Sequence, residues 1–175
     1  MNNNTPIKIL LAPFSKPVPD GDKLIPSPKD YPYWENLVSE LKRTGKYEFG
    51  QISVTGQPEL KLVSRYHQNL TYRQMVELVQ EYDTFISVDT FLPHIAHLLG
   101  KVGVVLWGMG NPKYFGYEDN LNIYKDEKYF REDKLTWMVW AYTQANENAW
   151  DKPGIVANKI KSRINSLIKH NRGEV

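Results

Sequence analysis

The chain contains no cysteine, so disulfide bonds and thiolate metal sites are excluded. No apolar run approaches the ~20 residues that a membrane-spanning helix needs. The N-terminus, residues 1–6, lacks the pattern of a signal peptide. The net charge of +2 is too small to indicate a nucleic-acid partner. From these absences we expect a cytoplasmic protein without a membrane span and without a nucleic-acid function.

The composition is that of an ordinary globular domain. Hydrophobic residues make up 41% of the chain and charged residues 24%. A length of 175 residues is enough for one domain with a sizeable core. Because the sequence shows neither an internal repeat nor a second domain, we expect a single domain over residues 1–175, with flexible tails at 1–6 and 171–175.

Short apolar runs alternate with helical patterns along the chain. The apolar runs predict strands at residues 7–12, 48–54, 85–88 and 102–107. Helical spacing predicts helices at residues 33–44, 90–99 and 153–170, and a further helix that opens with a capping box at Thr71 and Gln74. Residues 113–151 are irregular and aromatic. The alternation predicts an α/β fold in a single domain, with a parallel sheet and helices on both faces.

The most informative segment is Ser87-Val88-Asp89-Thr90, in which a buried strand ends at an acidic residue and a helix follows at once. We expect Asp89 and Thr90 to cap this helix at the carboxyl end of the strand, where open α/β sheets bind ligands. The unpaired first amides and the helix dipole suit a phosphate or diphosphate there. Pro93 fits the first helical turn, and His94 should lie near the mouth of the crevice.

Two loops are also candidates for ligand contact. Residues 14–32 form a connection rich in proline and charge, about 20 residues long, which favours a binding loop over a plain linker. The second loop, residues 108–112, is glycine-rich and directly follows the predicted strand at 102–107. Glycine lets a backbone approach a ligand closely.

These features follow one another in a specific order. A lysine loop comes first, then Gly-x-x-Glu at 56–59, then Asp-Thr-x-x-x-His at 89–94, and then a strand, the glycine-rich loop and Asn-Pro at 111–112. This order resembles the C-terminal half of glycosyltransferase family 9, the ADP-heptose:lipopolysaccharide heptosyltransferases and their relatives. The similarity covers roughly residues 7–123 and is strongest at 84–116.

The resemblance implies half of a GT-B fold, in which two Rossmann-like domains face one cleft. The C-terminal domain of such enzymes holds the nucleotide-sugar donor, and the N-terminal domain supplies the acceptor contacts and the catalytic base. By this resemblance Asp89 contacts the donor sugar, Thr90 and the following amides hold the diphosphate, and His94 shapes the pocket.

The remaining expected contacts also come from the resemblance. Either Lys29 or Lys23 balances the phosphate charge, and Ser15 adds a phosphate hydrogen bond. Glu59 contacts the nucleoside, as a carboxylate can pair with a ribose diol. The loop after the last buried strand passes close to the nucleotide through Gly108, Met109 and Asn111.

Two departures from the family pattern affect the expected function. The family has glycine after Asp-Thr, whereas this chain has Phe91, which would narrow the approach to the diphosphate or change which sugar fits. The chain is also about half the length of such an enzyme, and the family's catalytic base is absent from it. Either Asp89 serves as the base, or a second subunit or partner chain provides it.

The sequence therefore predicts a protein that binds a nucleotide-diphosphate sugar, ADP-linked by the resemblance, and transfers the sugar by inverting displacement if it is active. The alternative is a non-catalytic nucleotide-binding module, or one half of a two-chain transferase. No cofactor is required, because a lysine and helix amides can neutralise the leaving group.

Two further patterns favour structural roles. His94 and His97 share a helix face, but no third metal ligand is evident, so we expect no metal and a packing role for His97. The basic residues of the last helix are expected to form a solvated face: Lys159, Lys161, Arg163, Lys169 and Arg172. That helix should pack locally or form a homodimer, with the aromatic segment at 114–150 holding it over the sheet.

Overall fold

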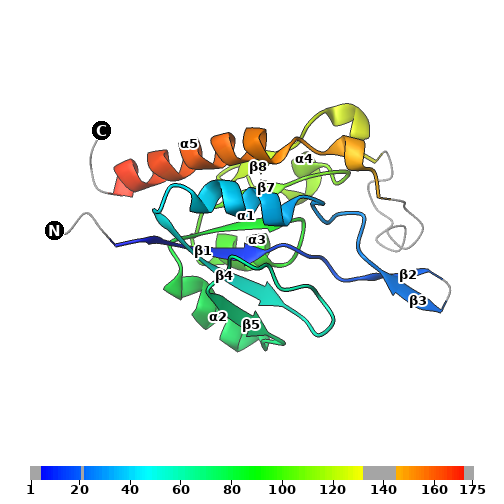
Figure 1. Ribbon diagram of the computed structural model, residues 1–175, viewed down its shortest axis with the longest axis horizontal. Helices are drawn as coiled ribbons and strands as arrows, with labels where there is room; N and C mark the ends of the chain where they lie inside the picture. Colours follow the sequence, from blue (N-terminus) through cyan, green and yellow to red (C-terminus); the bar gives the residue numbers. More distant parts are fainter. Residues whose placement is uncertain (1–4, 21, 132–144, 172–175) are drawn as a thin grey trace.

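The computed structural model describes residues 5–20, 22–131 and 145–171, and within them a six-stranded parallel sheet forms the centre of the molecule (Figure 1). Its strands stand in the order β5-β4-β1-β6-β7-β8. Their bounds are β1 Ile7–Ala12, β4 Tyr47–Ser53, β5 Arg65–Gln68, β6 Thr84–Val88, β7 Val104–Leu106 and β8 Leu121–Ile123. The predicted α/β fold with a parallel sheet is confirmed.

Helices cover both faces of the sheet. On one face lie α1 (Trp34–Lys42) and α5 (Pro153–Asn171), and on the other lie α2 (Tyr72–Glu81) and α3 (Leu92–Leu98). The alternation of side chains along β1 explains the two layers, because Ile9 and Leu11 join the core under α1 and α5 while Leu10 and Ala12 join the core under α2 and α3. Because β1 is buried on both faces, its sequence is an almost continuous apolar run rather than an alternation of apolar and polar residues.

Most predicted elements are present with small shifts of their ends. The strand at 7–12 has the predicted bounds, and the capping box of Thr71 and Gln74 opens α2. Helix α1 ends just before Gly45, whose positive φ of 67° suits glycine. Helix α5 buries Val156, Ala157, Ile160 and Ile164 and packs against α1, as expected for local packing.

The prediction that Asp89 and Thr90 cap a helix over 90–99 was wrong. Helix α3 begins at Leu92, its N-cap position is Phe91, and no side chain caps it. Instead, Oγ1 of Thr90 accepts a hydrogen bond from the Leu92 amide at 3.3 Å, in a turn that precedes the helix. Pro93 lies in the first helical turn, as predicted.

Several short elements were not predicted. The long loop after β1 contains an antiparallel hairpin, β2 (Val18–Asp20) and β3 (Lys23–Ile25), which projects from the body in Figure 1. The region taken as irregular contains β8 and a short helix, α4 (Pro112–Phe115). Strand β5 was missed because it lies at the sheet edge, and most of its residues are exposed and polar.

Some predictions fall beyond what the structure describes. Residues 1–4 and 172–175 of the expected tails, and residues 132–144 of the aromatic segment, lie outside the described residues. Within the described residues, no helix has both the length and the apolar character needed to cross a bilayer.

The strand order places a topological switch point between β1 and β6. From β1 the chain proceeds to β4 and β5, and it then returns to β6 on the other side of β1 and continues to β7 and β8. The connections after β1 and β6 therefore leave in opposite directions, and Ala12 pairs with Ser87 where both strands end. In open α/β sheets this is the position of the ligand crevice.

Candidate functional site

An ion pair occupies the switch point. Nζ of Lys29, from the loop after β1, lies 3.1 Å from Oδ2 of Asp89, the residue that follows β6. Their side chains are only 20% and 16% exposed, so the pair is partly shielded from solvent. A shielded cation and carboxylate at the carboxyl edge can respectively neutralise a phosphate and accept hydrogen bonds from a hydroxylated ligand.

A tight turn positions Lys29. In Ser27-Pro28-Lys29-Asp30, the Asp30 amide donates to the Ser27 carbonyl at 3.0 Å, and the Lys29 amide donates to Ser27 Oγ at 3.3 Å. Serine at the first turn position and proline at the second are the residues this geometry favours. The backbone that carries the Lys29 side chain is therefore held locally by its own sequence.

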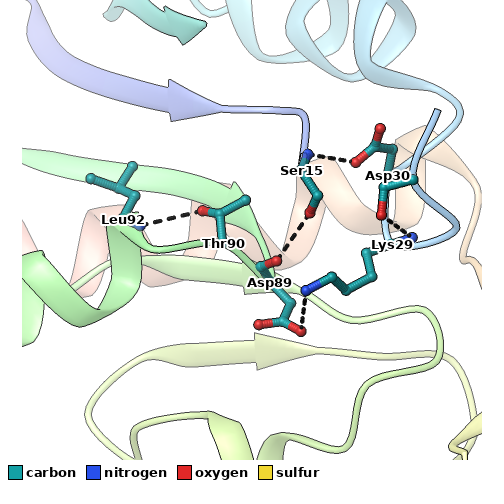
Figure 2. A network of polar contacts seen from close by, with 7 residues as sticks. Ser15, Lys29, Asp30, Asp89, Thr90 and Leu92 are labelled. Carbon is teal, nitrogen blue, oxygen red and sulfur yellow. Dashed lines mark hydrogen bonds and ion pairs between the residues drawn. The ribbon is translucent and has the colours of Figure 1, made fainter. Parts of the chain in front are cut away.

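Ser15 connects this turn to Asp89, the residue after β6 (Figure 2). Its amide donates to Oδ1 of Asp30 at 2.7 Å, and its hydroxyl donates to the carbonyl of Asp89 at 3.1 Å. Nε2 of Gln57 donates to the Ser15 carbonyl at 2.9 Å. Since Ser15 is 7% exposed and its hydroxyl proton is used by Asp89, the expectation that it donates to a phosphate is not supported by its placement.

Asp30 is the titratable group of this network whose environment is most unusual. Burial raises its pKa from 3.8 to about 6, and the hydrogen bonds from the Ser15 and Ser27 backbone and the charge of Lys29 only partly offset this. Sequence reasoning missed both Asp30 and Gln57. Asp30 could have been noticed as the last residue of the turn, and Gln57 as part of the Gly-x-x-Glu segment.

The glycine-rich loop lies directly over Asp89. A Cβ at Gly110 would lie 3.3 Å from Oδ2 of Asp89, so the backbone here closely approaches the carboxylate. Gly108 has a different reason to be glycine, because a Cβ there would lie 2.4 Å from the Trp150 ring. Core packing thus explains why this position is glycine, and nucleotide contact at Gly108 stays a prediction.

The next residues of this loop are also occupied by structural contacts. The Met109 side chain is buried in the core and its carbonyl accepts the Arg131 amide. Oδ1 of Asn111 accepts the Lys113 amide at 2.9 Å and caps α4. Nucleotide contact at Met109 and Asn111 stays a prediction.

On the other side of Asp89, the turn before α3 is partly exposed, whereas the first helical residues, Leu92 and Pro93, are buried. The amides of Thr90 and Phe91 have no acceptor among the described residues, and the Phe91 ring is 47% exposed. His94 lies further along the same helix, where its Nδ1 is 2.9 Å from the Tyr117 hydroxyl. His97 stacks on the Tyr117 ring at 3.8 Å, which confirms its packing role.

Two predicted contacts lie apart from this network. Lys23 is exposed on the projecting hairpin, where it pairs in register with Asp20. Glu59 is exposed in the β4–β5 connection. Burial raises the pKa of the Tyr66 hydroxyl, and the negative charge of Glu59 raises it further. Of the two candidate lysines, the fold brings Lys29 to Asp89.

No protein-family model matches the sequence, and no curated protein matches it. Solved structures do. Escherichia coli ADP-heptose lipopolysaccharide heptosyltransferase II matches with a TM-score of 0.60 at 16% identity, over 98% of this chain and 49% of that one. The dodecameric iron-containing heptosyltransferase TibC, in complex with ADP-D-β-D-heptose, matches with a TM-score of 0.57 at 13% identity, over 95% and 46%. The chain has the fold of one half of a heptosyltransferase.

The heptosyltransferase WaaC of E. coli, solved with ADP, also matches over 70% of this chain and 38% of that one, with 14% identity and a TM-score of 0.49. This chain therefore spans less than half of the length of each of these three proteins. Identities this low establish the heptosyltransferase-like fold alone. Within the described residues, no group of three or more histidine, aspartate and glutamate side chains is arranged to hold a metal ion.

Proposed function

We propose that the chain binds a nucleotide-diphosphate sugar, ADP-linked, in the crevice between β1 and β6, as the donor half of a glycosyltransferase. The observation that carries this proposal is the Lys29–Asp89 ion pair at the switch point. The heptosyltransferase-like fold supports it, since TibC, which shares the fold, was solved with ADP-D-β-D-heptose. A parallel sheet of this order binds ligands at this position.

The residues of the crevice suit such a donor. Lys29 supplies a positive charge for the diphosphate, and the open amides of Thr90 and Phe91 add hydrogen-bond donors beside it. The Asp89 carboxylate accepts hydrogen bonds from the sugar hydroxyls. We expect the exposed Phe91 side chain to border the same space and to limit the size of the sugar.

If the chain is active, the reaction is an inverting displacement. The acceptor hydroxyl oxygen bonds to the anomeric carbon while the bond from that carbon to the diphosphate oxygen breaks, and the diphosphate leaves with the electron pair. Lys29 stabilises the charge that develops on the leaving group. The proton of the acceptor hydroxyl passes to Asp89 or to a base on a second copy or a partner chain.

The second candidate is a binding module without turnover, or one half of a two-chain transferase. It is compatible with the fold, because the described residues form one half of a heptosyltransferase-like structure and such a half can hold a ligand without turnover. Product formation by the purified chain alone, with an ADP-sugar and a range of acceptors, separates turnover from binding. Activity that appears only after a partner protein is added would favour the two-chain form.

Thermal-shift titration tests the binding function. We expect ADP or an ADP-sugar, but not UDP, GDP or CDP, to raise the unfolding midpoint. Saturation at 100-fold over the Kd corresponds to about 2.7 kcal/mol and a shift of a few degrees. Lys29→Met and Asp89→Asn should abolish the shift.

Arg43→Met is the matched control, because it breaks an exposed ion pair with Glu40 at the end of α1, on the opposite edge of the sheet. This variant should keep the ligand shift. If no nucleotide moves the wild-type midpoint, or if Arg43→Met abolishes the shift as fully as Lys29→Met, the proposed site is wrong.

A further inference from the structure

Two independent connections join the loops that carry Lys29 and Asp89. The first is the ion pair itself. The second runs through Asp30, which follows Lys29 in the same turn. Its carboxylate accepts the Ser15 amide at 2.7 Å, and the Ser15 hydroxyl donates to the Asp89 carbonyl at 3.1 Å (Figure 2). The turn and the β6 loop are thereby held together without the side chain of Lys29.

This second connection matters because a lysine side chain is long and has many rotamers. An ion pair between a lysine and a carboxylate sets the distance between the ammonium nitrogen and the carboxylate oxygen. It leaves the backbone of each loop free to shift, because the long lysine side chain can change rotamer. A short charge-assisted hydrogen bond from a backbone amide to a carboxylate fixes both partners. The Asp30–Ser15 bond therefore determines where the turn lies, and the turn determines where the ammonium group can reach.

The position of Asp30 is costly for folding. Its carboxylate is largely removed from solvent, and the shift of its pKa to about 6 reflects an environment that opposes the charge. An apolar residue of similar size would avoid that penalty. A residue that lowers the stability of the fold, as a buried carboxylate does, is expected where function requires it.

We propose that Asp30 is a positioning residue of the donor site, which holds the Lys29 turn against the Asp89 loop through the Ser15 amide. The inference rests on the proposed function for its ligand, and it adds a residue that neither touches the nucleotide nor was expected from the sequence. Asp30 acts on the ligand through Lys29 and Asp89.

The test compares Asp30→Asn, which keeps an oxygen that can accept a hydrogen bond from the Ser15 amide, with Asp30→Leu, which branches at the same carbon but is larger and has no acceptor. At pH 7.5 we expect Asp30→Leu to weaken ADP binding about tenfold, as measured by calorimetry, while its unfolding midpoint stays at or above that of wild type. Asp30→Asn should bind within about threefold of wild type. Affinity and stability thus change in different directions, which a merely structural role would not produce.

Asp83 provides a matched control. Its Oδ2 accepts the Lys8 amide at 2.8 Å at the amino end of β1, so it makes the same type of bond at the opposite edge of the sheet. Asp83→Leu should leave ADP affinity unchanged. The proposal is overturned if Asp30→Leu binds ADP as wild type does, or if Asp30→Asn and Asp30→Leu lose affinity equally.

A second measurement separates this proposal from the proposed function. The coupling between Lys29 and Asp89, obtained from unfolding of the single and double variants, should persist with Asn at position 30 and disappear with Leu there. This readout needs no nucleotide. If wild type binds no nucleotide, the proposed function fails, and persistence of the coupling with Leu at position 30 would overturn the positioning role as well.

Discussion

Lys29 and Asp89 are 60 residues apart in the sequence, yet their side chains meet at 3.1 Å at the carboxyl edge of the sheet. Each lies in a connection that follows a strand beside the switch point, Lys29 in the loop after β1 and Asp89 directly after β6. Neither residue belongs to a helix or strand. Their meeting is therefore a consequence of strand order.

The strength of this ion pair can be measured with a double-mutant cycle. Because both side chains are at most one-fifth exposed, we expect Lys29→Met and Asp89→Asn to show a coupling of about 1 kcal/mol in unfolding by denaturant. The coupling should fall between low salt and about 1 M salt, where screening is strong. A coupling near zero at low salt would mean that the pair does not persist in solution.

The stability of the protein should depend on pH through Asp30. The pKa of this carboxyl is about 6 in the folded protein and 3.8 as a free side chain, so the folded state keeps a proton that the unfolded chain releases in that interval. The associated stability is fully present below pH 4 and is lost as the pH rises through 6.

The Asp30→Asn variant checks this dependence. It should match wild type near pH 4 and be more stable at pH 8 by about 2 kcal/mol, allowing for the part of Asp30 that remains solvated. Thermal or denaturant unfolding at both pH values measures the difference. A constant difference between the two proteins from pH 4 to pH 8 would show that Asp30 titrates normally.

Gly108→Ala should destabilise the protein by about 1–3 kcal/mol, because the added methyl group overlaps the Trp150 ring in a filled core. Gly154→Ala is the matched control, since it lies in the first turn of α5 and a Cβ there meets nothing within 4 Å. That change should be neutral or slightly stabilising. Equal effects of the two substitutions would contradict the packing explanation.

Phe91→Ala should change ligand selectivity with little effect on folding. The Phe91 ring is 47% exposed, so its removal leaves no cavity and the unfolding midpoint should stay within about two degrees of wild type. Under the proposed function, widening the approach to Asp89 should favour ADP-sugars over ADP itself. Calorimetric titration with both ligands measures the ratio of affinities, and an unchanged ratio would remove Phe91 from the site.

Much of the fold was predictable because its signals are local. The apolar run at 7–12 identifies β1 without reference to any other segment, and the capping box at Thr71 identifies the start of α2. Strand β5 and the β2–β3 hairpin were not predicted, because short, exposed strands show little alternation of apolar and polar residues. Their existence depends on pairing with a neighbour.

The candidate site was predictable only in part. Asp89 was recognisable at the end of a buried strand, whereas the role of Ser15 was not. Its hydroxyl could have faced a ligand, and only the register of β1 with β6 directs it to the Asp89 carbonyl. The packing of Gly108 against Trp150 could not be predicted either, because the two residues are distant in the sequence.

By itself the sequence determined the alternation of strands and helices, the acidic end of β6 and the turn that carries Lys29, because periodicity, burial and turn chemistry act over a few neighbouring residues. Only the tertiary structure decided that Lys29 rather than Lys23 meets Asp89, and that Asp30 and Ser15 connect their loops. Those contacts depend on which strands are neighbours and on where their carboxyl ends coincide. Strand order is a long-range property of the whole sheet, and no short segment of the chain encodes it.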